Sequence, residues 1–278
     1  MEKIKILVAC HKQAEVFKNN VYLPIHVGKA VHKDVDLGFQ GDDTGENISR
    51  LNPLYCELTA QYWGWKNLDV EYIGLCHYRR YFKTIITEDN VDDLMHGYDI
   101  MLVKKTCLPC NIISAAQMGL IPEDIALFYL YMKQKHTDIF PQFEKFFVHG
   151  IDLYPCNMFL CKKKLFDEFA EWQFGILEDL RKIYPLSNYS RCNRILGYLG
   201  EDLLPFYAYL KGWKIKEEPI VSYPNTGNKL LLQPKFNALK NKVRSYISHY
   251  GFHIGDDILA GLRNDGILDN NNLISATL

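Results

Sequence analysis

The chain alternates short apolar runs with longer segments of helical periodicity, and this alternation constrains the fold more than any other feature. The apolar runs 3–8, 71–76, 98–103, 154–161 and 214–221 are typical of buried strands. Segments 52–67, 125–135, 138–148, 164–183 and 196–210 repeat apolar residues at helical spacing. Such alternation is typical of an α/β fold, with a mostly parallel central sheet flanked by helices. We therefore predict that fold class.

One helix has a clear predicted start. Asn52 is a good N-cap residue, and Pro53 suits the first helical position. We predict a single helix from there to Asn67.

Composition excludes several classes of protein. Of 278 residues, 48% are hydrophobic, which excludes intrinsic disorder. The 32 Lys and Arg residues balance 33 Asp and Glu residues, which argues against a nucleic-acid partner. The eight cysteines lie mostly within apolar runs, and the apolar stretch at the N-terminus is too short for a secretory signal. We therefore expect a cytoplasmic protein with reduced thiols.

The last fifth of the chain differs in charge. We predict one catalytic domain over 1–225, and a C-terminal extension with a basic amphipathic helix and a polar tail over 226–278. Five basic residues and no acidic one occur between Lys229 and Arg244. Segment 229–250 can lie on the inner face of the cell membrane, or it can pack on the main domain with its lysines in solvent. We favour packing on the domain.

A compact basic cluster follows the second predicted strand. His77, Arg79 and Arg80 come directly after the apolar run, with Tyr78 among them. The carboxyl ends of strands in α/β folds are where ligands bind, and arginine presents a fork of donors suited to phosphate oxygens. The cluster predicts a diphosphate site. The alternative is a surface cluster that forms ion pairs with Glu71 or Asp99.

Four blocks of sequence resemble one bacterial family. They are the runs 41–49, 52–59, 62–67 and 74–82, and the similarity continues through 157–159 and 197–201. The family is that of the capsular or exopolysaccharide biosynthesis glycosyltransferases, long catalogued as a domain of unknown function. The resemblance implies a GT-A-like nucleotide-sugar fold over about residues 3 to 225. It also implies sugar transfer from a UDP-sugar donor to a growing, lipid-linked surface polysaccharide. Some relatives are galactofuranosyltransferases, so UDP-galactofuranose and UDP-galactose are the donors considered.

The resemblance also indicates how the donor would be held. GT-A enzymes usually bind a divalent metal through Asp-x-Asp after a central strand, whereas this strand ends in His77, Tyr78 and Arg79. We therefore expect no metal cofactor. The rival metal sites are the run 34–36, which is the one Asp-x-Asp of the chain, and the pair Asp42 and Asp43.

Of the remaining predicted binding residues, six lie in the matching blocks, and three (His11, His136 and Arg194) are predicted from their places elsewhere in the chain. We expect His11, after the first strand, on the nucleotide, and His136 and Asn157 on the acceptor or sugar. We expect the donor to contact these further residues: Asp43, Asn47, Glu57, Tyr78, Arg80 and Arg194. The alternatives are structural: turn residues for Asp43 and Asn47, a helix cap for Glu57, a core histidine for His11 and a strand edge for Asn157.

Transfer with inversion needs a carboxylate that takes the proton of the acceptor hydroxyl. Gly200, Glu201 and Asp202 resemble the acidic pair that supplies this base in inverting GT-A enzymes. Glu201 is the predicted base, and Asp202 is the second candidate. First-turn helix acids stabilised by the helix dipole are the alternative.

Two other functions use the same residues. One is a non-catalytic scaffold for polysaccharide assembly that retains nucleotide-sugar binding. The other is a phosphosugar or nucleotidyl transferase, which would need a divalent metal.

Overall fold

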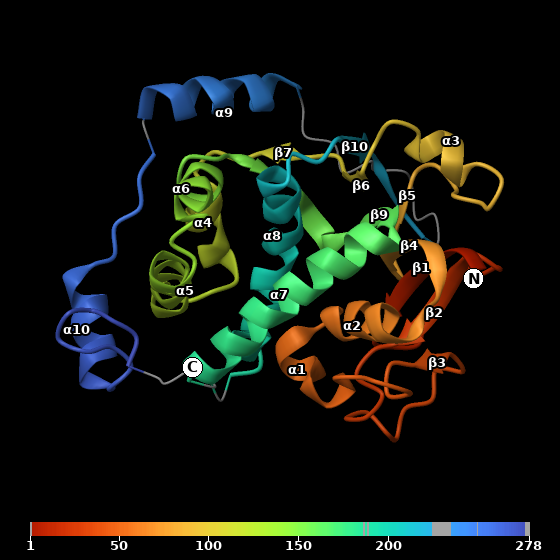
Figure 1. Ribbon diagram of the computed structural model, residues 1–278, viewed down its shortest axis with the longest axis horizontal. Coiled ribbons are helices and arrows are strands. Elements are labelled where there is room, and N and C mark those ends of the chain that lie inside the picture. The colour runs from red at the N-terminus through yellow and green to blue at the C-terminus, as the bar shows by residue number, and fades with distance from the viewer. Residues whose placement is uncertain (1, 186, 188, 224–234, 249, 276–278) are drawn as a thin grey trace. The chain divides into compact units, whose positions relative to one another are not determined.

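The computed structural model describes residues 2–185, 187, 189–223, 235–248 and 250–275 (Figure 1). The chain divides into two compact units, which are described separately. Unit 1 comprises Met1–Lys105, Tyr154–Gln173 and Gly200–Leu232, and unit 2 comprises Thr106–Leu153, Phe174–Leu199 and Gln233–Leu278. Within the described ranges, no helix is long and apolar enough to cross a membrane.

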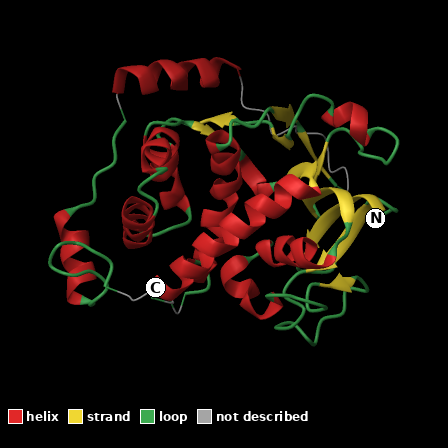
Figure 2. Cartoon of the chain, in the orientation of Figure 1, coloured by secondary structure: helices red, strands yellow, loops and turns green. Residues whose placement is uncertain are grey.

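Unit 1 is built on a mixed sheet, drawn in yellow in Figure 2. Its strands are β1 (Glu2–Cys10), β2 (Tyr22–His26), β3 (Gln40–Gly41), β4 (Val70–His77), β5 (Arg80–Phe82), β6 (Ile100–Val103), β9 (Phe159–Lys162), β10 (Ile215–Glu218) and β11 (Ile220–Ser222). The main path runs β10-β6-β9-β4-β1-β2-β3. On this path β9 is antiparallel to both neighbours, whereas every other adjacent pair is parallel. The mostly parallel α/β sheet predicted from the sequence is confirmed.

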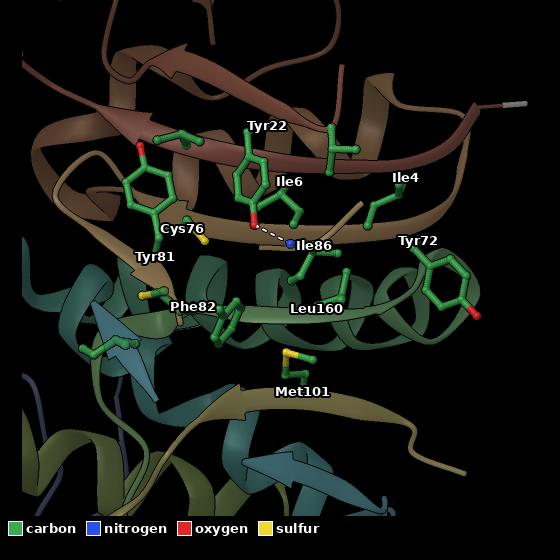
Figure 3. Close-up of a cluster of buried hydrophobic side chains, with 14 of the residues drawn as sticks. Ile4, Ile6, Tyr22, Tyr72, Cys76, Tyr81, Phe82, Ile86, Met101 and Leu160 are labelled. Atoms are coloured by element: carbon green, nitrogen blue, oxygen red, sulfur yellow. Dashed lines mark hydrogen bonds between the residues drawn. The ribbon is translucent and has the colours of Figure 1, made fainter. Parts of the chain in front are cut away.

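Strand alternation gives the sheet two apolar faces. Ile4 and Ile6 of β1 contribute to one buried cluster with Tyr22 and Leu160, and Figure 3 shows this cluster. The hydroxyl oxygen of Tyr22 accepts a hydrogen bond from the backbone N–H of Ile86 at 3.1 Å, so the buried oxygen has a partner (Figure 3).

The helices with residues in unit 1 are α1 (Asn52–Tyr55), α2 (Leu58–Asn67), α3 (Val91–Met95), and parts of α7 (Lys163–Ile183) and α8 (Ile195–Leu210), with the 3-10 turns η1 (Ser49–Leu51) and η4 (Pro155–Asn157). Helix α2 packs against Leu7 and Ile73 on the opposite face, whereas Val91 and Met95 of α3 belong to the first cluster. A Cβ on Gly64 of α2 would lie 2.6 Å from Leu7 Cδ1 on β1. A side chain at position 64 would therefore have to displace Leu7, so glycine suits the close approach of α2 to the sheet.

Unit 2 is mainly helical. Its elements are α4 (Ile112–Ala115), η2 (Ala116–Met118), α5 (Pro122–Lys135), α6 (Phe140–Phe143), the π-helical turn η3 (Glu144–Val148), η5 (Cys192–Arg194), α9 (Lys235–Ser248), α10 (Asp256–Asn264), the remainder of α7 and α8, and the paired strands β7 (Thr106–Cys107) and β8 (Asp152–Leu153). An aromatic cluster forms part of its core. Phe143 of α6, for example, packs with its ring 4.6 Å from that of Phe147.

Two predictions of local structure are wrong, and one strand was missed. The helix predicted over 52–67 is broken at Cys56, which has φ +52°. The strand predicted over 154–161 begins only at Phe159, after the turn η4. The strand β2, with Pro24 at its centre, was not predicted. The predicted boundary at 225 between domain and extension lies outside the described residues and stays a prediction.

Candidate functional site

The candidate site lies in unit 1, where β4 ends. Ala9 of β1 pairs in parallel with His77 of β4, so both strands present their carboxyl ends at the same edge. His77 also pairs with Arg80 of β5, and Tyr78 and Arg79 form the two-residue turn between these antiparallel strands. A strand that ends in a tight hairpin thus places the basic cluster at the sheet edge where α/β folds bind ligands.

The turn exposes one cation above a buried ring. Arg79 is exposed, and its guanidinium carbon lies 5.0 Å from the centre of the Tyr78 ring. Tyr78 is buried, and its hydroxyl has no hydrogen-bond partner among the residues that the structure describes. The edge of the His11 ring also packs against Tyr78, with the ring centres 5.3 Å apart. The side chains of His11, Tyr78 and Arg79 therefore lie together, and the buried ring of Tyr78 contacts the other two.

Cys156 is hydrogen-bonded to two of the predicted site residues, His77 and Glu201. The His77 Nε2 lies 2.6 Å from the carbonyl oxygen of Cys156, and because a carbonyl can only accept, Nε2 carries the proton. The backbone N–H of Cys156 donates to Oε1 of Glu201 at 2.5 Å. One residue therefore joins the end of β4 to helix α8.

The backbone at this residue is strained. Cys156 has φ +77° and Asn157 has φ +45°, both in the left-handed region that non-glycine residues rarely adopt. Each such residue costs about 1–3 kcal/mol and persists only where surrounding contacts hold it. The hydrogen bonds to His77 and Glu201 are such contacts.

Charged groups surround the thiol of Cys156. Burial is the main cause that raises the pKa of this thiol. Glu201 and Glu57 raise the pKa further, whereas Arg80 lowers it. Three predicted site residues, Arg80, Glu57 and Glu201, thus lie close enough to the Cys156 thiol to change its pKa.

Helix α8 has a sequence that fits Glu201 into this place. A Cβ on Gly200 would lie 2.4 Å from Leu58 Cδ1, so any larger residue would have to displace Leu58 where α8 approaches α2. Pro205, four residues after Glu201, has no N–H to donate to the Glu201 carbonyl. Burial, and then the charge of Glu201, raises the pKa of Asp202 well above its usual value. Glu201 therefore remains the better candidate for a base, because burial makes the Asp202 carboxylate harder to ionise.

A chain of buried amides extends from Asn157, and the sequence analysis missed two of its members. The Asn157 amide donates to Glu57 Oε1 at 3.4 Å and to Gln61 Oε1 at 3.5 Å. Gln61 donates to Gln173 Oε1 at 2.5 Å, and Gln173 donates to the Gly200 carbonyl at 3.0 Å. Gln61 and Gln173 are fully buried. The sequence signal that could have identified them is a glutamine on the apolar side of each helix, Gln61 in α2 and Gln173 in α7.

The break at Cys56 determines where Glu57 lies. Cys56 separates α1 from α2 with φ +52° and ψ −130°, and its carbonyl accepts from the Asn52 side chain at 2.7 Å. Glu57 therefore lies immediately before α2, where the helix dipole stabilises a negative charge. Asn52, predicted as an N-cap, is instead the first residue of α1.

The loop that carries Asp43 and Asn47 is held by Asp42. The Asp42 carboxylate is buried and accepts from the backbone N–H of Gly28 at 2.8 Å and of Lys29 at 3.1 Å. Asn47 bonds to the Gly45 carbonyl and the Ser49 N–H within the same loop, whereas Asp43 is exposed. The hydrogen bonds of Asp42 thus hold the loop in shape. That Asp43 and Asn47 contact the donor stays a prediction.

Two predicted residues belong to unit 2. The guanidinium carbon of Arg194 lies 5.4 Å from the Tyr198 ring centre. His136 has Nε2 at 3.1 Å from the Tyr131 hydroxyl, and burial lowers its pKa. These contacts with tyrosines do not test whether Arg194 binds the donor or His136 the acceptor, and both roles stay predictions.

The described residues contain no group of three or more His, Cys, Asp or Glu side chains placed to hold a metal ion. Asp36, in the Asp-x-Asp run, is exposed; its Oδ1 accepts from the Gly38 N–H at 3.0 Å and lies 3.6 Å from Lys29 Nζ. Independence from a metal cofactor stays a prediction.

Comparison with solved structures finds a similar fold in a known enzyme. The apo structure of WbbM, a bifunctional glycosyltransferase, matches with a TM-score of 0.67 at 28% sequence identity. The match covers 84% of this chain and 47% of that one, so the chain spans about half the length of WbbM. The fold is GT-A-like, as predicted.

Comparison by sequence gives the family. No curated protein matches the chain. The family described as "Domain of unknown function (DUF4422)" matches residues 5–212, which is most of the chain. The chain therefore belongs to the DUF4422 family.

Proposed function

We propose that the chain is a glycosyltransferase that moves a sugar from a UDP-sugar to a growing, lipid-linked surface polysaccharide. The observation that carries the proposal is the pair of hydrogen bonds at Cys156, which ties the basic end of β4 to the Glu201 carboxylate. Cations for a diphosphate and a carboxylate for a proton are the two groups that sugar transfer needs in one place. Similarity to the bifunctional glycosyltransferase WbbM supports this reading.

The proposed step is a single displacement with inversion. The acceptor hydroxyl oxygen forms a bond to the anomeric carbon as the bond from that carbon to the β-phosphate oxygen breaks. UDP leaves with the bonding electrons, and Glu201 takes the hydroxyl proton. Arg79 and Arg80 stabilise the negative charge that develops on the diphosphate. UDP-galactofuranose and UDP-galactose are the donors to test first.

Cations stand at the strand end where carboxylates would bind a metal, so we propose that transfer needs no divalent metal. The test is release of UDP from each UDP-sugar, measured with and without EDTA. Equal turnover in EDTA supports the proposal. Loss of turnover in EDTA would favour the metal-dependent phosphosugar or nucleotidyl transferase, and binding of UDP without any turnover would favour the scaffold.

Arg79 provides a direct test of the diphosphate site. Arg79→Ala removes a charge-assisted donor, so we expect UDP to bind about tenfold or more weakly in calorimetry. Lys164→Ala is the matched control. Lys164 is exposed and follows Lys162, which pairs with Tyr72 near the opposite end of β4 from His77. Equal affinity of Arg79→Ala and the control would refute the assigned role.

Glu201 provides the test of the base. Glu201→Gln keeps an oxygen that accepts from the Cys156 N–H but cannot take a proton at neutral pH. We expect kcat to fall by about 10²–10⁴, with UDP affinity nearly unchanged. Glu168→Gln, on the exposed side of α7, should change neither quantity. If kcat of Glu201→Gln is retained, the carboxylate is structural.

A further inference from the structure

Helix α9 of unit 2 has an unusual charge composition. Its 14 residues, Lys235–Ser248, include four basic residues (Lys235, Lys240, Lys242 and Arg244) and no acidic one. Part of the predicted segment 229–250, namely 229–234 and 249, lies outside the described residues. The helix itself is described, and its orientation can be read from burial.

The face of α9 that touches unit 2 is small and polar. Ala238, Asn241 and Ser245 are half-buried and follow one another at helical spacing. The Asn241 side chain donates to the Cys107 carbonyl of β7 at 2.8 Å, and α9 lies beside β7 in Figure 1. The contact with the rest of the unit is therefore polar.

The apolar face of α9 points to solvent. The exposed fractions are 63% for Leu239, 52% for Val243, 82% for Tyr246 and 71% for Ile247. At 100° per residue these four side chains form one stripe, on the side opposite Asn241. A surface helix of a globular protein normally buries such a stripe. The rest of unit 2 therefore does not cover the apolar side of these described residues, and packing of that side on the main domain stays a prediction.

Basic residues border the stripe on both sides. Lys242 lies on one flank, and Lys240 and Arg244 lie on the other, all of them exposed. An apolar stripe between two rows of cations is complementary to an anionic lipid surface, in which headgroup phosphates lie above acyl chains. A protein partner would need an apolar groove bordered by acids on both sides.

We propose that α9 lies on the surface of an anionic lipid bilayer, with Leu239, Val243, Tyr246 and Ile247 at the boundary of the acyl chains. Lys240, Lys242 and Arg244 bind the lipid phosphates. The polar contact at Asn241 fixes which side of the helix faces outward. This proposal concerns unit 2 and is independent of the transfer reaction proposed for unit 1.

The test is sedimentation of the full chain with phosphatidylcholine vesicles, with and without phosphatidylglycerol. We expect binding only to the anionic vesicles, and weaker binding at high salt. Ile247→Ser should weaken binding about tenfold, because burial of a large aliphatic side chain is lost. Lys242→Gln should weaken it about fivefold, since one charge at the surface contributes about that much. Ile85→Ser, at an exposed isoleucine of unit 1, is the matched control and should bind as the wild-type chain does.

Equal binding of Ile247→Ser and Ile85→Ser to anionic vesicles would overturn the proposal. So would equal binding of the wild-type chain to neutral and anionic vesicles. A second copy of the chain is the other occupant to test. A dimer in sedimentation velocity that Ile247→Ser dissociates, together with no vesicle binding, would assign the stripe to self-association instead. Because Ile247 is exposed, circular dichroism and the thermal midpoint should be unchanged in the variant.

Discussion

The hydrogen bond between Gln61 and Gln173 offers a quantitative test of the buried amide chain. Both side chains are fully buried, and Gln61 Nε2 lies 2.5 Å from Gln173 Oε1. Gln61→Met would leave the Gln173 oxygen without its donor in a region without solvent. A buried polar atom that loses its partner costs about 1–3 kcal/mol. We therefore expect Gln61→Met to lower the free energy of unfolding by about 2 kcal/mol.

The second single variant should have a similar effect. Gln173→Met would leave Gln61 Nε2 without an acceptor and remove the donor to the Gly200 carbonyl. The double variant leaves neither member of the pair unsatisfied, because two apolar side chains of similar length then face each other. Its loss should be smaller than the sum of the single losses, by about 1–3 kcal/mol.

Urea unfolding of the four proteins, followed by tryptophan fluorescence, measures this coupling. Gln117→Met, at an exposed glutamine in η2, is the control and should change stability by less than about 0.5 kcal/mol. Losses of the two single variants that add within about 0.5 kcal/mol in the double variant would refute the argument. The two glutamines would then be independent of each other.

Two further predictions concern a close approach and a buried histidine. Gly200→Ala should destabilise the protein by about 1 kcal/mol, because overpacking against Leu58 outweighs the gain in helix propensity. Gly175→Ala is the control: no atom lies within 4 Å of its new Cβ, so it should raise the free energy of unfolding by about 1 kcal/mol. The same change in the free energy of unfolding for both variants would contradict the packing argument. Burial lowers the pKa of His26, whose ring nitrogens have no partner among the described residues. As the pH falls from about 7 to 5, the unfolded chain takes up a proton at His26 more readily than the folded chain does, so the wild-type protein should lose stability relative to His26→Gln. Unfolding at each pH measures this, and His96→Gln, at an exposed histidine, is the control.

The sheet was largely predictable because its strands are apolar runs that period and length identify. β1, β4, β6 and β10 all lie within or close to predicted runs. β2 was missed because Pro24 interrupts a run of only five residues. Proline is tolerated there because β3 pairs only with Ile25 and His26, so β2 is an edge at Pro24. That pairing is a property of the folded sheet and has no local signal.

Part of the site was predictable in the same way. His77 and Arg80 follow a strand, and their place at its carboxyl end results from the α/β fold alone. Glu57, Asn157 and Glu201 were expected from family resemblance, and the structure brings all three to Cys156 and its neighbour. The buried Gln61 and Gln173 were missed because helical periodicity assigns a side to a residue and not a hydrogen-bond partner.

The strained residues show why the remaining part could not be predicted. Cys56 and Cys156 both have positive φ, although nothing in their side chains favours it. Cys56 breaks a helix that its sequence would continue, and this break places Glu57 before α2. Cys156 turns its N–H to Glu201 and its carbonyl to His77, so each strained residue orients groups from distant segments. Local preference opposes both conformations, so tertiary contacts must supply the free energy that holds them. Strain that is retained where a carboxylate and a basic cluster meet is more readily explained by a functional arrangement than by stability, because a relaxed backbone would be more stable.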